Sequence, residues 1–298
     1  MGTRKHRGSK RKNNTLFNKY KLYILLFIFL LVIVLIFAAI IKNLADYKST
    51  DIDAGTAVEP VSDITDYQNL SSSDIPLMLS DDDSAPVKPG CVIEGAEDLY
   101  SNSYVISNPD DRLSIVNKKY NLSSSYAPQD LVTVTIPFSP GRTDDVKQMR
   151  SFAADALSEL CAAAEFDEGY ILYGASGYRS YNTQMVLFNK SVESKGSIYE
   201  ANKLNAVPGQ SEHQLGLAMD LTLEELNYEL NESFGETEEG IWLKNNAHRY
   251  GFILRYPKEK EHITGYSYEP WHFRYVGKET AKYIYENDLT LEEFYGLY

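Results

Sequence analysis

The stretch Ser211-Glu212-His213-Gln214-Leu215-Gly216-Leu217-Ala218-Met219-Asp220 places an imidazole and a carboxylate seven residues apart. Apolar side chains occupy one parity, at Leu215, Leu217, Met219 and Leu221, and small or polar ones occupy the other, at Gly216, Ala218, Asp220 and Thr222. This period of two predicts a strand with one face in a core and the other open around Asp220. A catalytic zinc takes three protein ligands, so a third ligand is expected elsewhere in the chain.

The third ligand is expected in Tyr268-Glu269-Pro270-Trp271-His272-Phe273-Arg274-Tyr275-Val276, which alternates in the same way. The alternation predicts a second strand that opens just after a proline, with His272 on one face. Glu269 falls in the turn before it. A carboxylate three residues before a metal ligand can lie beside the attacking water without binding the metal, which is the position a general base needs. The residue types therefore fit a zinc site of His213, Asp220 and His272 with Glu269 as base.

These motifs resemble the D-alanyl-D-alanine carboxypeptidase family of the VanY type, zinc peptidases that trim the peptide stems of bacterial peptidoglycan. The resemblance lies in Ser211-x-His213-x-x-Gly216-x-Ala218-x-Asp220, Glu269-Pro270-Trp271-His272 and the upstream Gly177-Tyr178-Arg179-Ser180. It covers residues 109–298. It implies one zinc per chain on His213, Asp220 and His272, with Glu269 as the catalytic base and peptidoglycan stem peptides as substrate.

Three further polar residues are expected in the substrate site. Arg179 follows a predicted strand at a turn, where a guanidinium can face a cleft and bind a carboxylate through two hydrogen bonds. The resemblance gives Arg179 a substrate role, either holding the terminal carboxylate or polarising the scissile carbonyl. Gln184 either adds a hydrogen bond to substrate or lies on a solvated helix face. Ser211 either binds substrate or completes a local turn.

The amino-terminal region has the pattern of a membrane anchor. Residues 1–21 carry eight Lys and Arg and no acidic residue, and residues 22–41 are uncharged. Twenty apolar residues at about 1.5 Å each span the ~30 Å hydrocarbon core. The basic tail is expected in the cytoplasm and everything after the span outside the cell. The run exceeds the apolar region of a signal peptide, which favours an uncleaved single-pass helix and localisation in the cell membrane.

The rest of the chain is acidic. Nine of the 29 Lys and Arg lie in residues 1–42, which leaves 20 basic against 42 acidic residues, a net charge of −22. Such an exterior argues against nucleic-acid binding. Residues 42–108, rich in Asp, Ser and Pro, are expected to form an extended linker with short strands near its end. Cys161 is predicted to be a small core residue, and a disulfide between Cys161 and Cys91 stays open.

The remaining residues, 109–298, are enough for one domain with a core. Extended segments are expected at 113–118, 131–136, 170–176 and 252–256, and helices at 144–164, 181–194, 240–249 and from residue 278 onward. Ser180 is expected to cap the second helix. No repeating βαβ unit is present. The pattern predicts an α+β fold, with a largely antiparallel sheet flanked by helices and the zinc site in a cleft.

The predicted protein is a membrane-anchored zinc D,D-carboxypeptidase that removes the terminal D-Ala of stem peptides. An L,D-carboxypeptidase acting on the tetrapeptide stem is an open alternative, since the motifs do not separate the two specificities. A non-hydrolytic wall-binding module of the same fold is a third interpretation. The complete set of His213, Asp220, Glu269 and His272 argues against it. A serine D,D-peptidase is disfavoured because no Lys-Thr-Gly motif occurs.

Overall fold

The computed structural model describes residues 95–298. The predicted basic tail, membrane span at 22–41, Cys91 and most of the acidic linker lie outside the described residues. Within residues 95–298, no helix is long and apolar enough to cross a bilayer. The elements in chain order are η1 (Glu97–Tyr100), β1 (Tyr104–Val105), β2 (Tyr120–Asn121), β3 (Leu131–Thr133), η2 (Asp145–Lys147), β4 (Gln148–Arg150), α3 (Ser151–Glu168), β5 (Tyr173–Ser176), α4 (Tyr181–Lys195), α5 (Ile198–Leu204), η3 (Glu212–Leu215), β6 (Ala218–Thr222), η4 (Glu232–Glu236), α6 (Glu238–Asn246), η5 (Ala247–Tyr250), β7 (Phe252–Leu254), α7 (Glu261–Thr264), β8 (His272–Tyr275), α8 (Lys278–Glu286) and α9 (Leu291–Phe294), where η marks a 3-10 helix.

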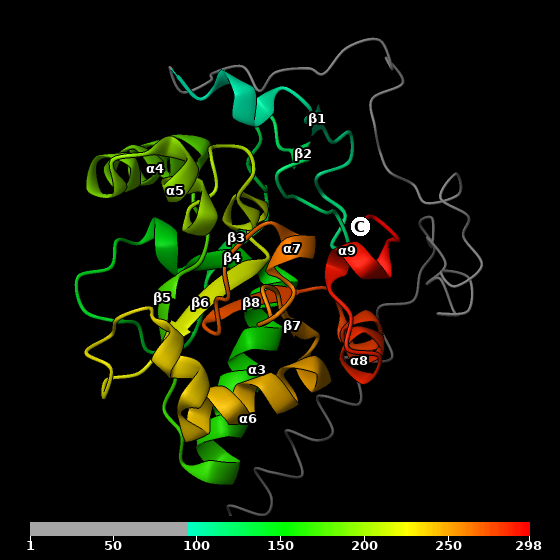
Figure 1. Ribbon diagram of the computed structural model, residues 1–298. Coiled ribbons are helices and arrows are strands. Elements are labelled where there is room, and N and C mark those ends of the chain that lie inside the picture. The colour runs from blue at the N-terminus through cyan, green and yellow to red at the C-terminus, as the bar shows by residue number, and fades with distance from the viewer. Residues whose placement is uncertain (1–94) are drawn as a thin grey trace, which may run out of the picture. The chain divides into compact units, whose positions relative to one another are not determined.

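A four-stranded sheet carries the site, with strand order β5-β6-β8-β7 and antiparallel neighbours throughout (Figure 1). Asp220 on β6 pairs with Ser176 on β5 and with His272 on β8. Helices flank the sheet. The predicted α+β fold with a largely antiparallel sheet is confirmed.

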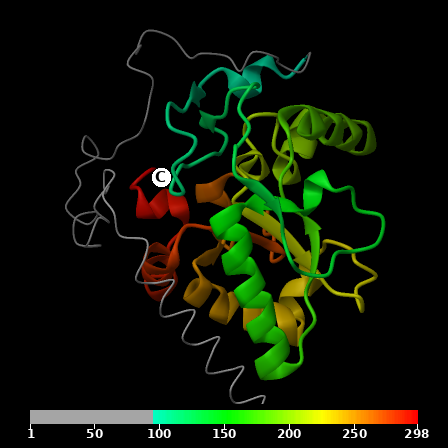
Figure 2. The same cartoon turned by 180° about the vertical axis from the view of Figure 1, so that it is seen from behind.

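One face of the sheet packs on α3, the long helix that crosses in front of the strands in Figure 2. Met219 and Leu221 of β6 and Phe273 of β8 share a core with Leu157 and Leu160 of α3, and all five side chains are fully buried. Because side chains alternate along a strand, Asp220 and His272 point away from this core. The alternation in the stretches around Asp220 and His272 therefore places both polar side chains on the sheet face opposite α3.

The strand predicted from the alternation of residues 215–222 begins later than that pattern does. His213 belongs to η3, and the strand begins only at Ala218. Between them Gly216 turns the chain with a φ of +68°, and its N–H donates to the His213 carbonyl at 3.1 Å. A Cβ at Gly216 would lie 2.8 Å from a methyl of Leu131. Positive φ and close packing together require glycine at this point, and the alternation in sequence runs across the turn.

The helix predicted at 144–164 begins later, at Ser151. Residues 148–150 instead form β4, which pairs antiparallel with β3. The Arg150 N–H also donates to the Gly216 carbonyl at 2.8 Å. These partners are distant in sequence, so local periodicity could not reveal the strand. The extended segment predicted at 113–118 is irregular, and its neighbour β2 covers only two residues.

Other predicted elements are confirmed. Helix α4 starts directly after Ser180, whose hydroxyl accepts from the Thr183 N–H at 3.1 Å. The helical segment predicted at 240–249 is present as α6 and η5, and Gly251 follows it with a φ of +90°. Cys161 is buried in the core with no disulfide partner among the described residues. Because Cys91 lies outside them, their pairing stays a prediction.

Residues 95–108 are part of the packed structure, upstream of the boundary expected at 109. Strand β1 pairs in parallel with β2. Tyr100 is buried in a small cluster with Phe188 of α4, Ala201 of α5 and Val207. The strand expected at 104–106 is thus present as β1.

Candidate metal and catalytic site

Three of the predicted residues converge into a group able to hold a metal ion. The ligand atoms of His213, Asp220 and His272 all lie within 4.8 Å of one another, and the three residues are buried. Asp220 and His272 face each other across β6 and β8, which places their side chains on the same face. The η3 turn brings His213 Nε2 to 3.4 Å from Asp220 Oδ2, and His272 Nδ1 lies 3.1 Å from Asp220 Oδ1.

Hydrogen bonds orient His213 for ligation. Its Nδ1 lies 2.7 Å from the Gly177 carbonyl, so Nδ1 carries the proton and Nε2 keeps a lone pair. Burial, helped by the Arg179 charge, lowers the pKa of His213 to about 4, which keeps the ring neutral as a ligand must be. His213 Nε2 and Asp220 Oδ1 are buried without a hydrogen-bond partner. Unpartnered atoms on two members of a group whose ligand atoms lie within 4.8 Å of one another fit a zinc ion.

Asp220 and His272 are strongly coupled. Burial alone would raise the pKa of Asp220, but the two imidazoles hold it well below its usual range. Burial opposes the charged form of His272, yet the nearby carboxylates of Asp220 and Glu212 raise its pKa to about 9. In the metal-free protein the His272 ring is therefore protonated near neutral pH. Metal binding must release that proton.

Glu269 stands beside the ligands but outside their group. The turn before β8 is closed by the His272 N–H, which donates to the Glu269 carbonyl at 3.1 Å. This turn brings Glu269 Oε2 to 3.7 Å from His272 Nδ1. Burial raises the pKa of Glu269 to about 8. A carboxyl group that exchanges a proton near neutral pH has the property that general acid and base catalysis requires.

Arg179 lies next to the ligand group. Its Nη2 is 3.9 Å from Asp220 Oδ2, and its Nη1 donates to Gln184 Oε1 at 3.0 Å. The Gln184 amide donates in turn to the Ala206 carbonyl at 2.7 Å. Gln184 is buried rather than solvated, and its contacts hold the guanidinium in place. Its predicted direct bond to substrate stays a prediction.

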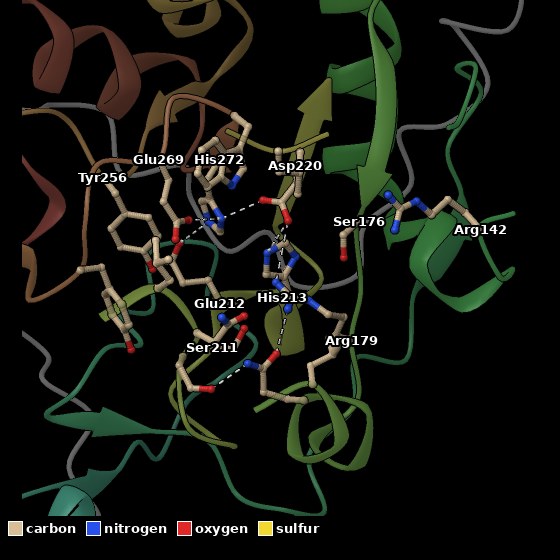
Figure 3. Close-up of a pocket in the computed structure, with 18 residues that line it drawn as sticks. Arg142, Ser176, Arg179, Ser211, Glu212, His213, Asp220, Tyr256, Glu269 and His272 are labelled. Carbon is tan, nitrogen blue, oxygen red and sulfur yellow. Dashed lines mark hydrogen bonds and ion pairs between the residues drawn. The ribbon is translucent and has the colours of Figure 1, made fainter. Parts of the chain in front are cut away.

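These residues line one pocket of about 340 Å³. Figure 3 shows Tyr256 and Glu269 on one side of the pocket and Arg142 on the other, with His272 and Asp220 between them. Ser211 faces the pocket too, and its side chain does not cap η3. Tyr266, from the segment between α7 and β8, also contributes to the wall.

Several pocket residues were not found from the sequence. Arg142, Ser176 and Tyr256 line the cavity, and the Tyr256 ring lies 4.9 Å from the His272 ring between centroids. Arg142 comes from a loop without periodicity, so no sequence signal marked it. Glu212 did carry a signal: it is a charged residue directly before a ligand in a stretch that is otherwise apolar or site-forming.

Comparisons with known proteins agree with this geometry. Residues 146–278 match the VanY family, described as D-alanyl-D-alanine carboxypeptidase. YodJ of Bacillus subtilis is 51% identical over 190 residues, which cover 64% of this chain and 69% of YodJ. The solved structure of the LdcB LD-carboxypeptidase is 50% identical, with a TM-score of 0.62, and the match covers 65% of this chain and 90% of LdcB. The zinc complex of a vancomycin-resistance D,D-pentapeptidase, VanY, is 36% identical with a TM-score of 0.51, over 61% of this chain and 98% of VanY.

Proposed function

The chain belongs to the VanY family of zinc-dependent D-alanyl-D-alanine carboxypeptidases, and from that premise we propose that it removes the terminal D-alanine from peptidoglycan stem peptides. One observation carries the proposal: His213, Asp220 and His272 converge within 4.8 Å, and Glu269 lies beside them in the same pocket. A wall-binding module that had lost hydrolysis would not need all four. The set supports an active hydrolase.

The proposed ligands are His213 Nε2, an Asp220 carboxylate oxygen and His272 Nδ1, the atoms that face one another in the site. Three protein ligands leave a fourth position for water, as in catalytic zinc sites. When bound there, zinc lowers the pKa of water toward about 7 and polarises a carbonyl oxygen.

Glu269 is the proposed general base. A cation in the site favours the ionised carboxylate and so offsets the effect of burial on the pKa of Glu269. The carboxylate then takes a proton from the water that attacks the scissile carbonyl. The protonated Glu269 passes this proton to the nitrogen of the departing D-alanine. Both transfers need a carboxyl group close to the ligands, and Glu269 Oε2 lies 3.7 Å from His272 Nδ1.

Arg179 is the proposed electrostatic stabiliser of the tetrahedral oxyanion. Its guanidinium is held by Gln184, and its Nη2 lies 3.9 Å from Asp220 Oδ2, next to the proposed zinc ligands. This position favours polarisation of the carbonyl over anchoring of the terminal carboxylate. Ser211, at the pocket wall, is then available to the terminal carboxylate as a hydrogen-bond donor.

Two substrates are compatible with this site. The D,D reaction on the pentapeptide is the proposed activity, because the matched family is described by the D-alanyl-D-alanine bond. An L,D reaction on the tetrapeptide is a second candidate, favoured by the 50% identity to the LdcB LD-carboxypeptidase. Both release one D-alanine from a carboxyl terminus, so the catalytic groups serve either.

Parallel incubation with a defined pentapeptide and tetrapeptide tests the proposal, with D-alanine quantified by mass spectrometry. We expect D-alanine from the pentapeptide at the higher kcat/KM. Faster release from the tetrapeptide would replace the D,D assignment with the L,D one. Release from neither would contradict the proposed hydrolase.

We also propose that residues 22–41 anchor the protein in the cell membrane and that residues 42–108 carry the enzyme toward the wall. The charge pattern of residues 1–41 supports this topology. An extracytoplasmic position would give the enzyme access to its proposed substrate.

A further inference from the structure

A buried set of charges adjoins the metal site through Glu212, which also lines the pocket. Glu212 Oε1 accepts from Arg255 Nε at 2.8 Å and from Arg274 Nη1 at 2.7 Å. Arg255 also makes a two-pronged contact with Glu292 of α9, with both nitrogen–oxygen distances at 2.7 Å. All four side chains are at most 2% exposed. This charge cluster, Glu212, Arg255, Arg274 and Glu292, joins η3, β8, the end of β7 and the carboxyl-terminal helix.

The charge cluster touches the proposed metal site at one point. Glu212 Oε2 lies 3.6 Å from His272 Nε2, and each atom is buried without a hydrogen-bond partner. The other ring nitrogen, Nδ1, faces Asp220. The two ring nitrogens of His272 therefore face different carboxylates: Nδ1 faces the proposed zinc ligand Asp220, and Nε2 faces Glu212. A small adjustment would close the gap to a hydrogen bond.

Stability alone is a weak reason for such a cluster. Burying charges costs solvation free energy, and well-packed apolar side chains often stabilise a protein as much. A carboxylate held rigidly behind a metal-binding histidine has a specific use, because it fixes the proton on the remote nitrogen and sets the orientation of the ring. Both arginines donate hydrogen bonds to Glu212 Oε1, and this leaves Oε2 facing His272.

We propose that Glu212 is a positioning residue for His272: its carboxylate accepts a hydrogen bond from the Nε2–H and so presents Nδ1 to the metal. Arg255 and Glu292 hold Glu212 in place, so α9 contributes to metal affinity although it lies outside the pocket. This inference rests on the proposed assignment of His272 as a zinc ligand. It assigns Glu212 no contact with substrate.

The test compares zinc affinity of the full chain and its variants, by competition with a chromophoric chelator. Glu212→Gln is expected to weaken zinc binding 10–100-fold, the range found when partners of ligating histidines are removed. Glu292→Gln should weaken it less. Glu293→Gln is the matched control: it removes a carboxylate of the same helix that pairs with Lys260 at 3.0 Å, away from His272, and zinc affinity should stay within about twofold.

A second readout separates positioning from stability. The visible spectrum of the cobalt-substituted protein reports ligand geometry, and it should change in Glu212→Gln but not in Glu293→Gln. Should Glu212→Gln fail to fold, Glu212→Asp keeps the charge that both arginines require while withdrawing the carboxylate from His272, and it should show the same loss of affinity. Wild-type zinc affinity and cobalt spectrum in whichever Glu212 variant folds would overturn the inference. Full zinc retention by His272→Ala would overturn both this inference and the ligand assignment beneath it.

Discussion

Asp220 and His272 are distant in sequence, yet strand register makes them direct neighbours. Their residues pair across β6 and β8, and His213 reaches the same point through the turn at Gly216. The relative positions of Asp220 and His272 are thus set by the backbone hydrogen bonds between β6 and β8. Substituting a ligand should affect the metal more than the fold.

We expect the purified wild-type protein to bind about one zinc per chain and His272→Ala to lose most of it. Asp220→Asn should weaken zinc binding as well as activity, because a neutral amide replaces a charged oxygen ligand. Elemental analysis after dialysis against buffer checks both variants. Full zinc occupancy in His272→Ala would refute the ligand assignment.

The sequence identified the residues that perform the proposed chemistry but not those that support them. His213, Asp220, Glu269 and His272 stand in motifs whose spacing carries meaning. Glu212 and Arg274 lie within those motifs, but charged residues are usually solvated, and only tertiary packing shows that these two are buried. Arg255 has no local signal at all, because its partners come from η3 and α9.

At the level of elements, the sequence predicted structures with local causes and missed those with distant ones. Ser180 was predicted to cap α4, since capping involves neighbours only, and the bond to Thr183 confirms it. Strand β4 was missed because its partner β3 lies upstream and because its last residue, Arg150, donates to the carbonyl of the distant Gly216. The same limit hid the η3 turn, so the alternation that starts at residue 215 extends upstream of the true start of β6 at Ala218.

Ser180→Ala should lower the free energy of unfolding by about 1 kcal/mol, the usual cost of losing a helix cap. Urea denaturation measures it, with Ser180→Asp as the matched variant that keeps a capping oxygen. Because Arg179 directly precedes the cap, kcat is also expected to fall in Ser180→Ala. Equal stability of the alanine and aspartate variants would show that the cap contributes nothing.

For the whole molecule, the sequence suggests a topology that the described residues do not include. The basic tail and the acidic remainder, with a net charge of −22 after residue 42, lie on opposite sides of the apolar run. This topology can be predicted from the sequence alone, because membrane insertion depends on charge and hydropathy and not on the tertiary fold. The fold class was equally accessible, since it follows from the order of strands and helices.

Protease added to intact cells should release the catalytic domain by cutting within residues 42–94, while an epitope tag at residue 1 stays protected. Immunoblots for the tag and for the domain follow the two parts. Detergent-permeabilised cells serve as the control in which the tag is cut. Loss of the tag in intact cells would invert the proposed orientation.

The central claim is that Glu269 is the base beside a zinc held by three other residues, and turnover of zinc-loaded Glu269→Gln tests it most directly. Glutamine keeps the volume of the side chain but cannot accept a proton from water. We predict a loss of turnover of about 10²–10⁴ on the preferred stem peptide, with zinc occupancy close to that of the wild type. Turnover near the wild-type rate in the zinc-loaded variant would contradict the claim and leave Glu269 as a structural residue of the turn before His272.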